Sequence, residues 1–216
     1  HRRIRTLTAD VREVCAYCRE AGLLHVLNHP FQSFRWQKPL EAYLEDVLGL
    51  FTHVEGLNGC VPSAQNRAVS ALCARAASEG RRLVQVGGSD AHTVGRVGSA
   101  YTEARAESAR EFLDEIRAGR CSVGGRVFST AALLADVYRN IWTYHARLCT
   151  GRGEAGSPAA YAVDAAVATA CLPATLGGLP AAIVLGNQAR QNAVSRCVLS
   201  ALGSLDWGRL RLPAEA

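Results

Sequence analysis

The sequence predicts an α/β fold in which parallel strands alternate with helices, and two observations support this prediction. Three near-continuous apolar runs, residues 23–28, 52–58 and 83–88, are typical of strands that are covered on both faces. Segments with a helical spacing of apolar residues separate these runs, as they do in consecutive βαβ units. Right-handed crossover connections between the strands are then expected.

Local signals place each element. Asp10 with Glu13, and Ser108 with Glu111, have the spacing of capping boxes, and Pro39 suits the first turn of a helix. The expected helices cover residues 10–21, 39–51, 62–79 and 108–118. Besides the three apolar strands, shorter extended pieces are expected over residues 99–104 and 121–128.

We expect residues 1–128 to form the α/β domain and residues 129–216 to form a helical tail. A long helix is predicted from Ser129, and a flexible break follows over 151–158. Residues 165–189 carry no charge, which leaves a membrane span as one alternative. The prolines, glycines and amides in this stretch instead favour two packed helices and no membrane partner.

Composition limits the possible functions. The net charge of +5 over 216 residues is small, and the arginines are dispersed, so a nucleic-acid partner is not favoured. The eight cysteines are spread singly, often in apolar helical settings such as those of Cys73 and Cys171, which is typical of buried reduced thiols in a cytoplasmic protein. Cys15 and Cys18 form the one C-x-x-C motif of the sequence. We interpret them as core or partly exposed thiols of a helix, and the alternative is half a zinc site or a redox pair.

The beginning of the chain has no signal-peptide pattern, which agrees with the cytoplasmic prediction. The sequence also contains no methionine, not even at position 1. We therefore expect the natural protein to begin upstream of His1.

Polar side chains follow all three apolar strands. His29 comes after the first strand, Glu55 and Asn58 lie near the end of the second, and Asp90 and His92 follow the third. Ligands of α/β proteins bind at the carboxyl ends of strands, so we expect these groups to lie close together. In extended backbone, Asp90 and His92 would point the same way, and carboxylate with imidazole suits Zn, Mn or Fe.

Each of these residues also has a simpler structural interpretation. An aspartate after a strand often forms a turn or caps a helix, a histidine often makes structural hydrogen bonds, and Glu55 could pair with an arginine. We expect His25 to be structural and His53 and His145 to be surface or packing residues. The coincidence of polar groups at three strand ends favours a site.

These residues occur in motifs that resemble the PHP (polymerase and histidinol phosphatase) family, in its predicted metal-dependent phosphoesterase branch. The motifs are LNHPF (27–31), VEGLNG (54–59), Asn66-Arg67 and GSDAHTVGRVGSAYTE (88–103), in that order, and the resemblance covers residues 5–125. It implies a distorted (β/α)7 barrel with two or three divalent metal ions at the carboxyl-end rim.

The resemblance also implies a role for each site residue. His29, Asp90 and His92 match metal ligands and would be the catalytic residues, whereas Glu55 and Asn58 match positions that shape the substrate site. Arg35 is our candidate, from charge and placement alone, for contact with a substrate phosphate. The implied reaction is hydrolysis of a small phosphorylated substrate by a metal-activated water.

One departure from the family pattern limits this interpretation. The family begins with a His-x-His motif and further acidic ligands, and no His-x-His occurs in this chain. We therefore expect a partial barrel, the C-terminal half of a PHP domain, which needs the N-terminal half of the same domain as its partner and has little activity alone. Two alternatives are a degenerate PHP-like module that binds a ligand or partner without catalysis, and a PHP exonuclease module. The dispersed charge argues against the second.

Overall fold

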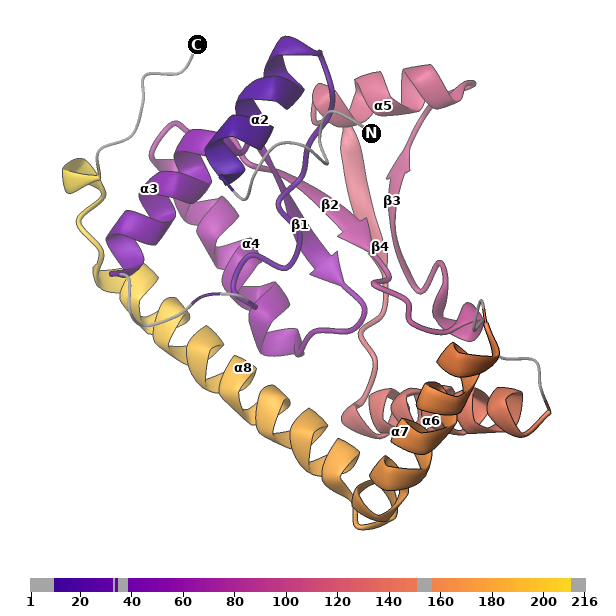
Figure 1. Cartoon of the computed structure of the whole chain (residues 1–216). Coiled ribbons are helices and arrows are strands. Elements are labelled where there is room, and N and C mark those ends of the chain that lie inside the picture. The colour runs from indigo at the N-terminus through magenta and orange to yellow at the C-terminus, as the bar shows by residue number, and fades with distance from the viewer. Residues whose placement is uncertain (1–9, 33, 35–38, 151–156, 211–216) are drawn as a thin grey trace.

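The computed structural model describes residues 10–32, 34, 39–150 and 157–210, and these form a mixed α/β fold (Figure 1). The helices are α2 (Val11–Glu20), α3 (Leu40–Leu50), α4 (Ser63–Ser78), α5 (Ala109–Arg117), α6 (Thr130–Cys149), α7 (Pro158–Leu176) and α8 (Leu179–Ser204), with short 3-10 turns η1 (Val94–Arg96) and η2 (Trp207–Arg209). The strands are β1 (His53–Asn58), β2 (Val84–Gly88), β3 (Ala100–Ala104) and β4 (Cys121–Gly125). The predicted α/β class is confirmed, but the strands and helices do not alternate throughout, since α2 is followed directly by α3 and no α-helix separates β2 from β3.

The capping residues act as their positions predict. The Asp10 side chain accepts a hydrogen bond from the backbone of Arg12, the Ser108 side chain accepts one from Glu111, and the Ser129 side chain accepts one from Ala132. Each bond satisfies an amide that has no partner within the first helical turn. Local chemistry therefore sets the starts of α2, α5 and α6.

Two small sheets form the strand layer. Strands β1 and β2 pair in parallel, from His53 opposite Val84 to Asn58 opposite Gly88. Strands β3 and β4 pair antiparallel. Thr102 of β3 joins the two sheets, because its Oγ1 contacts both the backbone N (2.9 Å) and the backbone O (3.1 Å) of Gly87 in β2.

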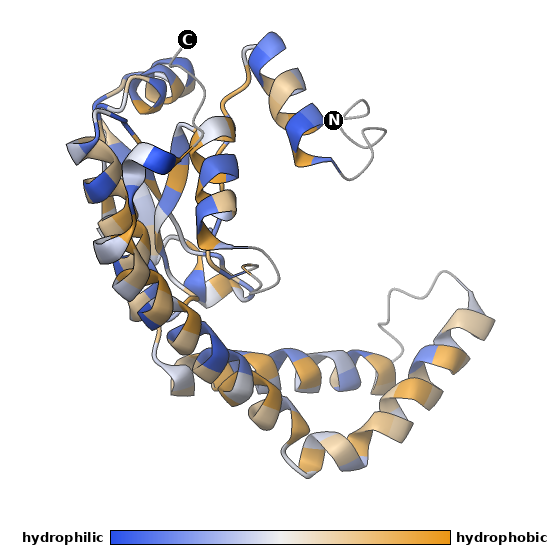
Figure 2. Ribbon diagram, turned by 90° about the vertical axis from the view of Figure 1, so that its left-hand side faces the viewer, coloured by the Kyte–Doolittle hydropathy of each residue, from blue (hydrophilic) through white to orange (hydrophobic). Residues whose placement is uncertain are grey.

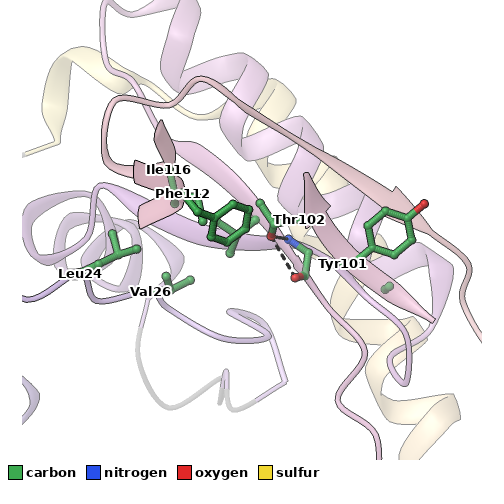
Figure 3. A pocket seen from close by; sticks show the side chains of 9 residues that line it. Leu24, Val26, Tyr101, Thr102, Phe112 and Ile116 are labelled. Carbon is green, nitrogen blue, oxygen red and sulfur yellow. Dashed lines mark hydrogen bonds between the residues drawn. The ribbon is translucent and has the colours of Figure 1, made fainter. Parts of the chain in front are cut away.

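The predicted first strand, residues 23–28, is reduced to one parallel bridge between Leu27 and Val54. Leu24 and Val26 instead border an apolar cavity of about 420 Å³. Figure 3 shows these two side chains facing Phe112 and Ile116 of α5 across that space. An apolar run favours an extended segment, but a ladder also needs a neighbouring strand edge in register, and only Leu27 meets one.

The partial (β/α)7 barrel predicted by resemblance is not confirmed. Ladders in the described residues join β1 only to β2 and β3 only to β4. Four paired strands are too few to close a barrel, and the antiparallel β3–β4 pair departs from an all-parallel barrel. The strand layer is an open arrangement with helices beside it (Figure 1).

The main core joins the α/β region to the tail. Helix α8 runs along α4 in Figure 1, and Val194, Val198 and Leu202 of α8 belong to the same buried cluster as Leu72 of α4. The boundary between 128 and 129 stays a prediction.

Residues 165–189 fold into parts of α7 and α8, which turn at Gly177–Gly178, so the prediction of two helices there is confirmed. Helix α7 contacts α6 and α8 but exposes Val163 and Val167, and its ribbon in Figure 2 is largely apolar in colour. Among the described helices, α7 is long and apolar enough to cross a membrane by length and composition, with 11% of that window buried. The absence of a membrane partner stays a prediction.

Candidate functional site

The candidate site lies where β1 and β2 end side by side. Asn58, the last residue of β1, pairs with Gly88, the last residue of β2, so the segments that follow both strands leave the sheet together. Glu55, Asn58 and Asp90 meet there, and we call these three residues the strand-end cluster. The prediction that polar groups from separate strands gather at one edge is confirmed for these three.

Asn58 is the centre of the strand-end cluster. Its Nδ2 donates to Glu55 Oε2 at 2.9 Å and to Asp90 Oδ2 at 3.3 Å, while its Oδ1 accepts from the backbone of Cys60 at 2.8 Å. The side chain of Asn66 in α4 binds both backbone groups of Asn58, which is only 1% exposed. Asn58 therefore holds two carboxylates at a fixed separation, because every one of its polar groups is engaged.

Glu55 connects the strand-end cluster to His29. Glu55 is 6% exposed, and its Oε2 accepts a hydrogen bond from the backbone N of His29 at 2.8 Å. Its described partners are thus amide N–H donors and not an arginine. Gly88 leaves space for the carboxylate, since a Cβ there would lie 2.6 Å from Glu55 Oε1.

Asp90 and His29 have an unusual backbone. Their φ angles are +49° and +33°, and they are the only non-glycine residues with positive φ in the described part of the chain. Such conformations are strained for L-residues, and they concentrate at functional sites. Both strained residues are among those that the family resemblance predicts as metal ligands.

The extended backbone predicted for Asp90 is wrong. The prediction assumed extended backbone, in which alternate side chains share a direction, but Asp90 is left-handed. The His92 ring instead turns back, so that its Nδ1 lies 2.8 Å from the Asp90 carbonyl oxygen. Cys60 donates its thiol hydrogen to the same oxygen at 3.1 Å, and Asn140 of α6 donates to the His92 carbonyl at 3.2 Å.

The residues do not make a complete metal centre by themselves. The described part of the chain contains no group of three or more His, Cys, Asp and Glu side chains placed to hold a metal ion. Glu55 and Asp90 are close to one another, but Asn58 separates them, and the contact of His29 with the cluster is through its backbone. The metal-binding and catalytic roles of His29, Asp90 and His92 stay predictions, and Arg35 lies outside the described residues.

The other histidines make structural contacts, as predicted. His25 approaches the carbonyls of Leu23 and Leu50, each at 3.3 Å. His53 is buried, with Nε2 at 3.0 Å from the Ile116 carbonyl oxygen. His145 contacts two backbone carbonyls of the tail helices.

The cysteines are all free thiols. Cys15, Cys18 and Cys73 are buried as expected, but Cys171 is exposed on α7, because that face of the helix has no neighbour in the described part of the chain. Cys60 was not predicted as a site residue. Burial and the nearby Asp90 carboxylate raise the pKa of the Cys60 thiol to about 11. In the sequence, the position of Cys60 two residues after Asn58 was the feature that could have indicated that Cys60 lies at the site.

Residues 73–121 match the family model described as PHP-associated, which confirms the resemblance to the C-terminal region of the PHP family over that segment. The segment includes Asp90 and His92, whereas His29, Glu55 and Asn58 precede it. No curated protein and no solved structure matches the chain.

Proposed function

We propose that this chain contributes part of the active site of a PHP-type metal-dependent phosphoesterase. The observation that carries the proposal is the pair of hydrogen bonds by which Asn58 holds the Glu55 and Asp90 carboxylates together at the ends of two parallel strands. The left-handed backbone of Asp90, at a position that matches a ligand of the family, supports the same conclusion.

In that site, the described residues would orient the carboxylates but would not supply all of the metal ligands. The hydrogen bond from His29 N to Glu55 and the clamp of Asn66 on Asn58 keep the acidic groups fixed. Preorganised carboxylates of this kind are the hard ligands that divalent metals take in hydrolytic sites. Because these residues alone do not gather three ligands, we propose that further ligands come from residues outside the described part of the chain.

A second candidate function is a PHP-like module that binds a ligand without hydrolysing it. The absence of a three-ligand group among the described residues favours it. The two candidates differ in whether the site, once it holds a divalent ion, hydrolyses a phosphate ester.

The deciding experiment compares this chain with the complete natural protein in which the sequence occurs. Hydrolysis of p-nitrophenyl phosphate is measured with and without Mn²⁺ or Zn²⁺, and metal binding is measured by calorimetry. Asp90→Asn is the informative variant because asparagine tolerates the positive φ of this position. Asp164→Asn, on α7, is the matched control.

We expect metal-dependent hydrolysis in the complete protein to fall about 100-fold or more in Asp90→Asn and to be unchanged in the control. Full activity of Asp90→Asn would remove Asp90 from the site. If the complete protein hydrolyses no p-nitrophenyl phosphate, with or without added metal, the binding module is favoured.

A further inference from the structure

A second cavity adjoins the strand-end cluster. Its volume is about 320 Å³, and its walls come from Gln32, which precedes α3, from the segments after β1 and β2, and from helices α6 and α8. Cys60, Asp90 and His92 form the wall nearest to the cluster. This volume is at the lower end of the range for pockets that bind small molecules.

Three residues that line the cavity each carry a buried hydrogen-bond acceptor that has no hydrogen-bond partner in the described part of the chain. Gln32 Oε1, Asp136 Oδ1 and Gln191 Oε1 are buried atoms without a hydrogen bond in the described part of the chain. The residues Asp136 of α6 and Gln191 of α8 are only 5% and 4% exposed. Buried polar atoms are normally paired, so three unpaired acceptors around one cavity indicate a missing donor.

Asp136 is held in place as an acceptor. Its Oδ2 receives a hydrogen bond from Arg96 Nε at 2.6 Å, while Arg139 approaches Oδ1 only to 4.0 Å, beyond hydrogen-bond distance. The Arg96 guanidinium compensates the charge of the carboxylate. Oδ1 therefore remains available for a neutral or a cationic donor.

The remaining walls define the rest of the ligand. The apolar residues Leu133 and Val137 of α6 and Ile183 and Val184 of α8 line the cavity, whereas no lysine or arginine is among its described lining residues. The carboxylate of Asp90, which receives a hydrogen bond from the neutral side chain of Asn58, disfavours an anion there. The walls suit an apolar body that carries hydrogen-bond donors, and they do not suit a phosphate.

We infer that this cavity binds the organic part of a ligand, an apolar body with hydroxyl or ammonium donors that pair with Gln32, Asp136 and Gln191. If the proposed function holds, on which this assignment rests, the group is the alcohol portion of the phosphate ester and its phosphate faces the strand-end cluster. Helices α6 and α8 of the tail then determine substrate specificity.

Three matched probes test the inference without requiring catalysis. 2-Phenylethylamine, 2-phenylethanol and 3-phenylpropionate share an apolar body and differ in carrying an ammonium, a hydroxyl or a carboxylate. Binding to this chain is measured by ligand-observed NMR titration. We expect the amine or the alcohol, or both, to bind with a Kd on the order of 1 mM, and the carboxylate to bind at least about tenfold more weakly.

Two variants locate the binding. Gln191→Met removes the acceptor at similar volume, and we expect it to weaken binding about tenfold. Gln65→Met is the matched control, because Gln65 is another buried glutamine whose Oε1 has no partner, outside the lining of this cavity. Val184→Phe keeps the three acceptors but fills the space, and we expect it to abolish binding.

Each outcome decides the inference. Donor-selective binding that is lost in Gln191→Met or Val184→Phe and kept in Gln65→Met supports it. Equal binding of the carboxylate, binding that both cavity variants leave unchanged, or no binding of any probe overturns it. If the probes bind but the complete protein hydrolyses no phosphate ester, the proposed function fails and the cavity assignment stands. Should Gln191→Met not fold, Val184→Phe still provides the test.

Discussion

The backbone N of His29 donates a hydrogen bond to Glu55 Oε2 at 2.8 Å, which ties the loop after residue 28 to the middle of β1. The same oxygen accepts from Asn58, so one carboxylate oxygen organises two segments of the candidate site.

Removal of the Glu55 carboxylate is expected to destabilise the fold. Glu55→Ala leaves the N–H of His29 and the amide of Asn58 without their acceptor, at a cost of about 2–4 kcal/mol in the free energy of unfolding. Glu55→Gln keeps an acceptor oxygen and should cost about 1 kcal/mol. Urea denaturation measures both. Equal losses in the two variants would show that the hydrogen bonds do not stabilise the site.

Gly88 is expected to tolerate no side chain. In Gly88→Ala the new Cβ would lie 2.6 Å from Glu55 Oε1, so the carboxylate must move, and we expect a loss of about 1–3 kcal/mol. Gly95→Ala is the control, because nothing lies within 4 Å of a Cβ there, and its effect should be within about 0.5 kcal/mol. Similar unfolding free energies for the two variants would contradict the close approach of Glu55 to Gly88.

Cys60 should be a slow nucleophile at neutral pH. Its pKa of about 11, raised by burial and then by Asp90, leaves about 100-fold less thiolate at pH 8 than a thiol of pKa 9.0 would have. Alkylation with iodoacetamide, followed by peptide mass spectrometry, should label the exposed Cys149 and Cys197 well before Cys60. The Cys60 rate should rise steeply above pH 9. Labelling of Cys60 as fast as Cys149 at pH 8 would refute the raised pKa.

The buried His53 should make stability sensitive to mild acid. Burial lowers the pKa of His53 below its ordinary value of 6.5, and Thr52 and the Ile116 carbonyl contact the two ring nitrogens. The unfolded chain then binds this proton more readily than the native one, so stability is complete above pH 6.5 and is lost as the pH falls through the lowered pKa.

The measurement for His53 is urea denaturation between pH 5 and pH 8. The protein should lose more stability over this range than His53→Gln, which cannot take up the proton. Carboxylates affect both proteins alike, so the difference between them isolates His53. Parallel pH profiles for the two proteins would be inconsistent with a lowered pKa.

The sequence by itself determined the helices and the two central strands. Asp10, Ser108 and Ser129 cap helices through bonds to residues two or three positions away, so local chemistry is sufficient. The apolar runs predicted β1 and β2, although only β1 is buried along most of its length and β2 is half-buried. The order of polar groups after those strands was equally readable, and it indicated that Glu55, Asn58 and Asp90 would meet.

Only the tertiary structure decided how those groups are oriented. Asp90 has a left-handed backbone and its carbonyl oxygen contacts the His92 ring, and no local pattern specifies that backbone angle. The run 23–28 forms one bridge because pairing depends on a neighbour that is distant in sequence. Likewise, Gln191 reaches the second cavity because α8 packs on α4, a contact that arises from burial of apolar surface between residues far apart in the chain. Asp136 reaches it from α6, which contacts α8 and is tied to Arg96.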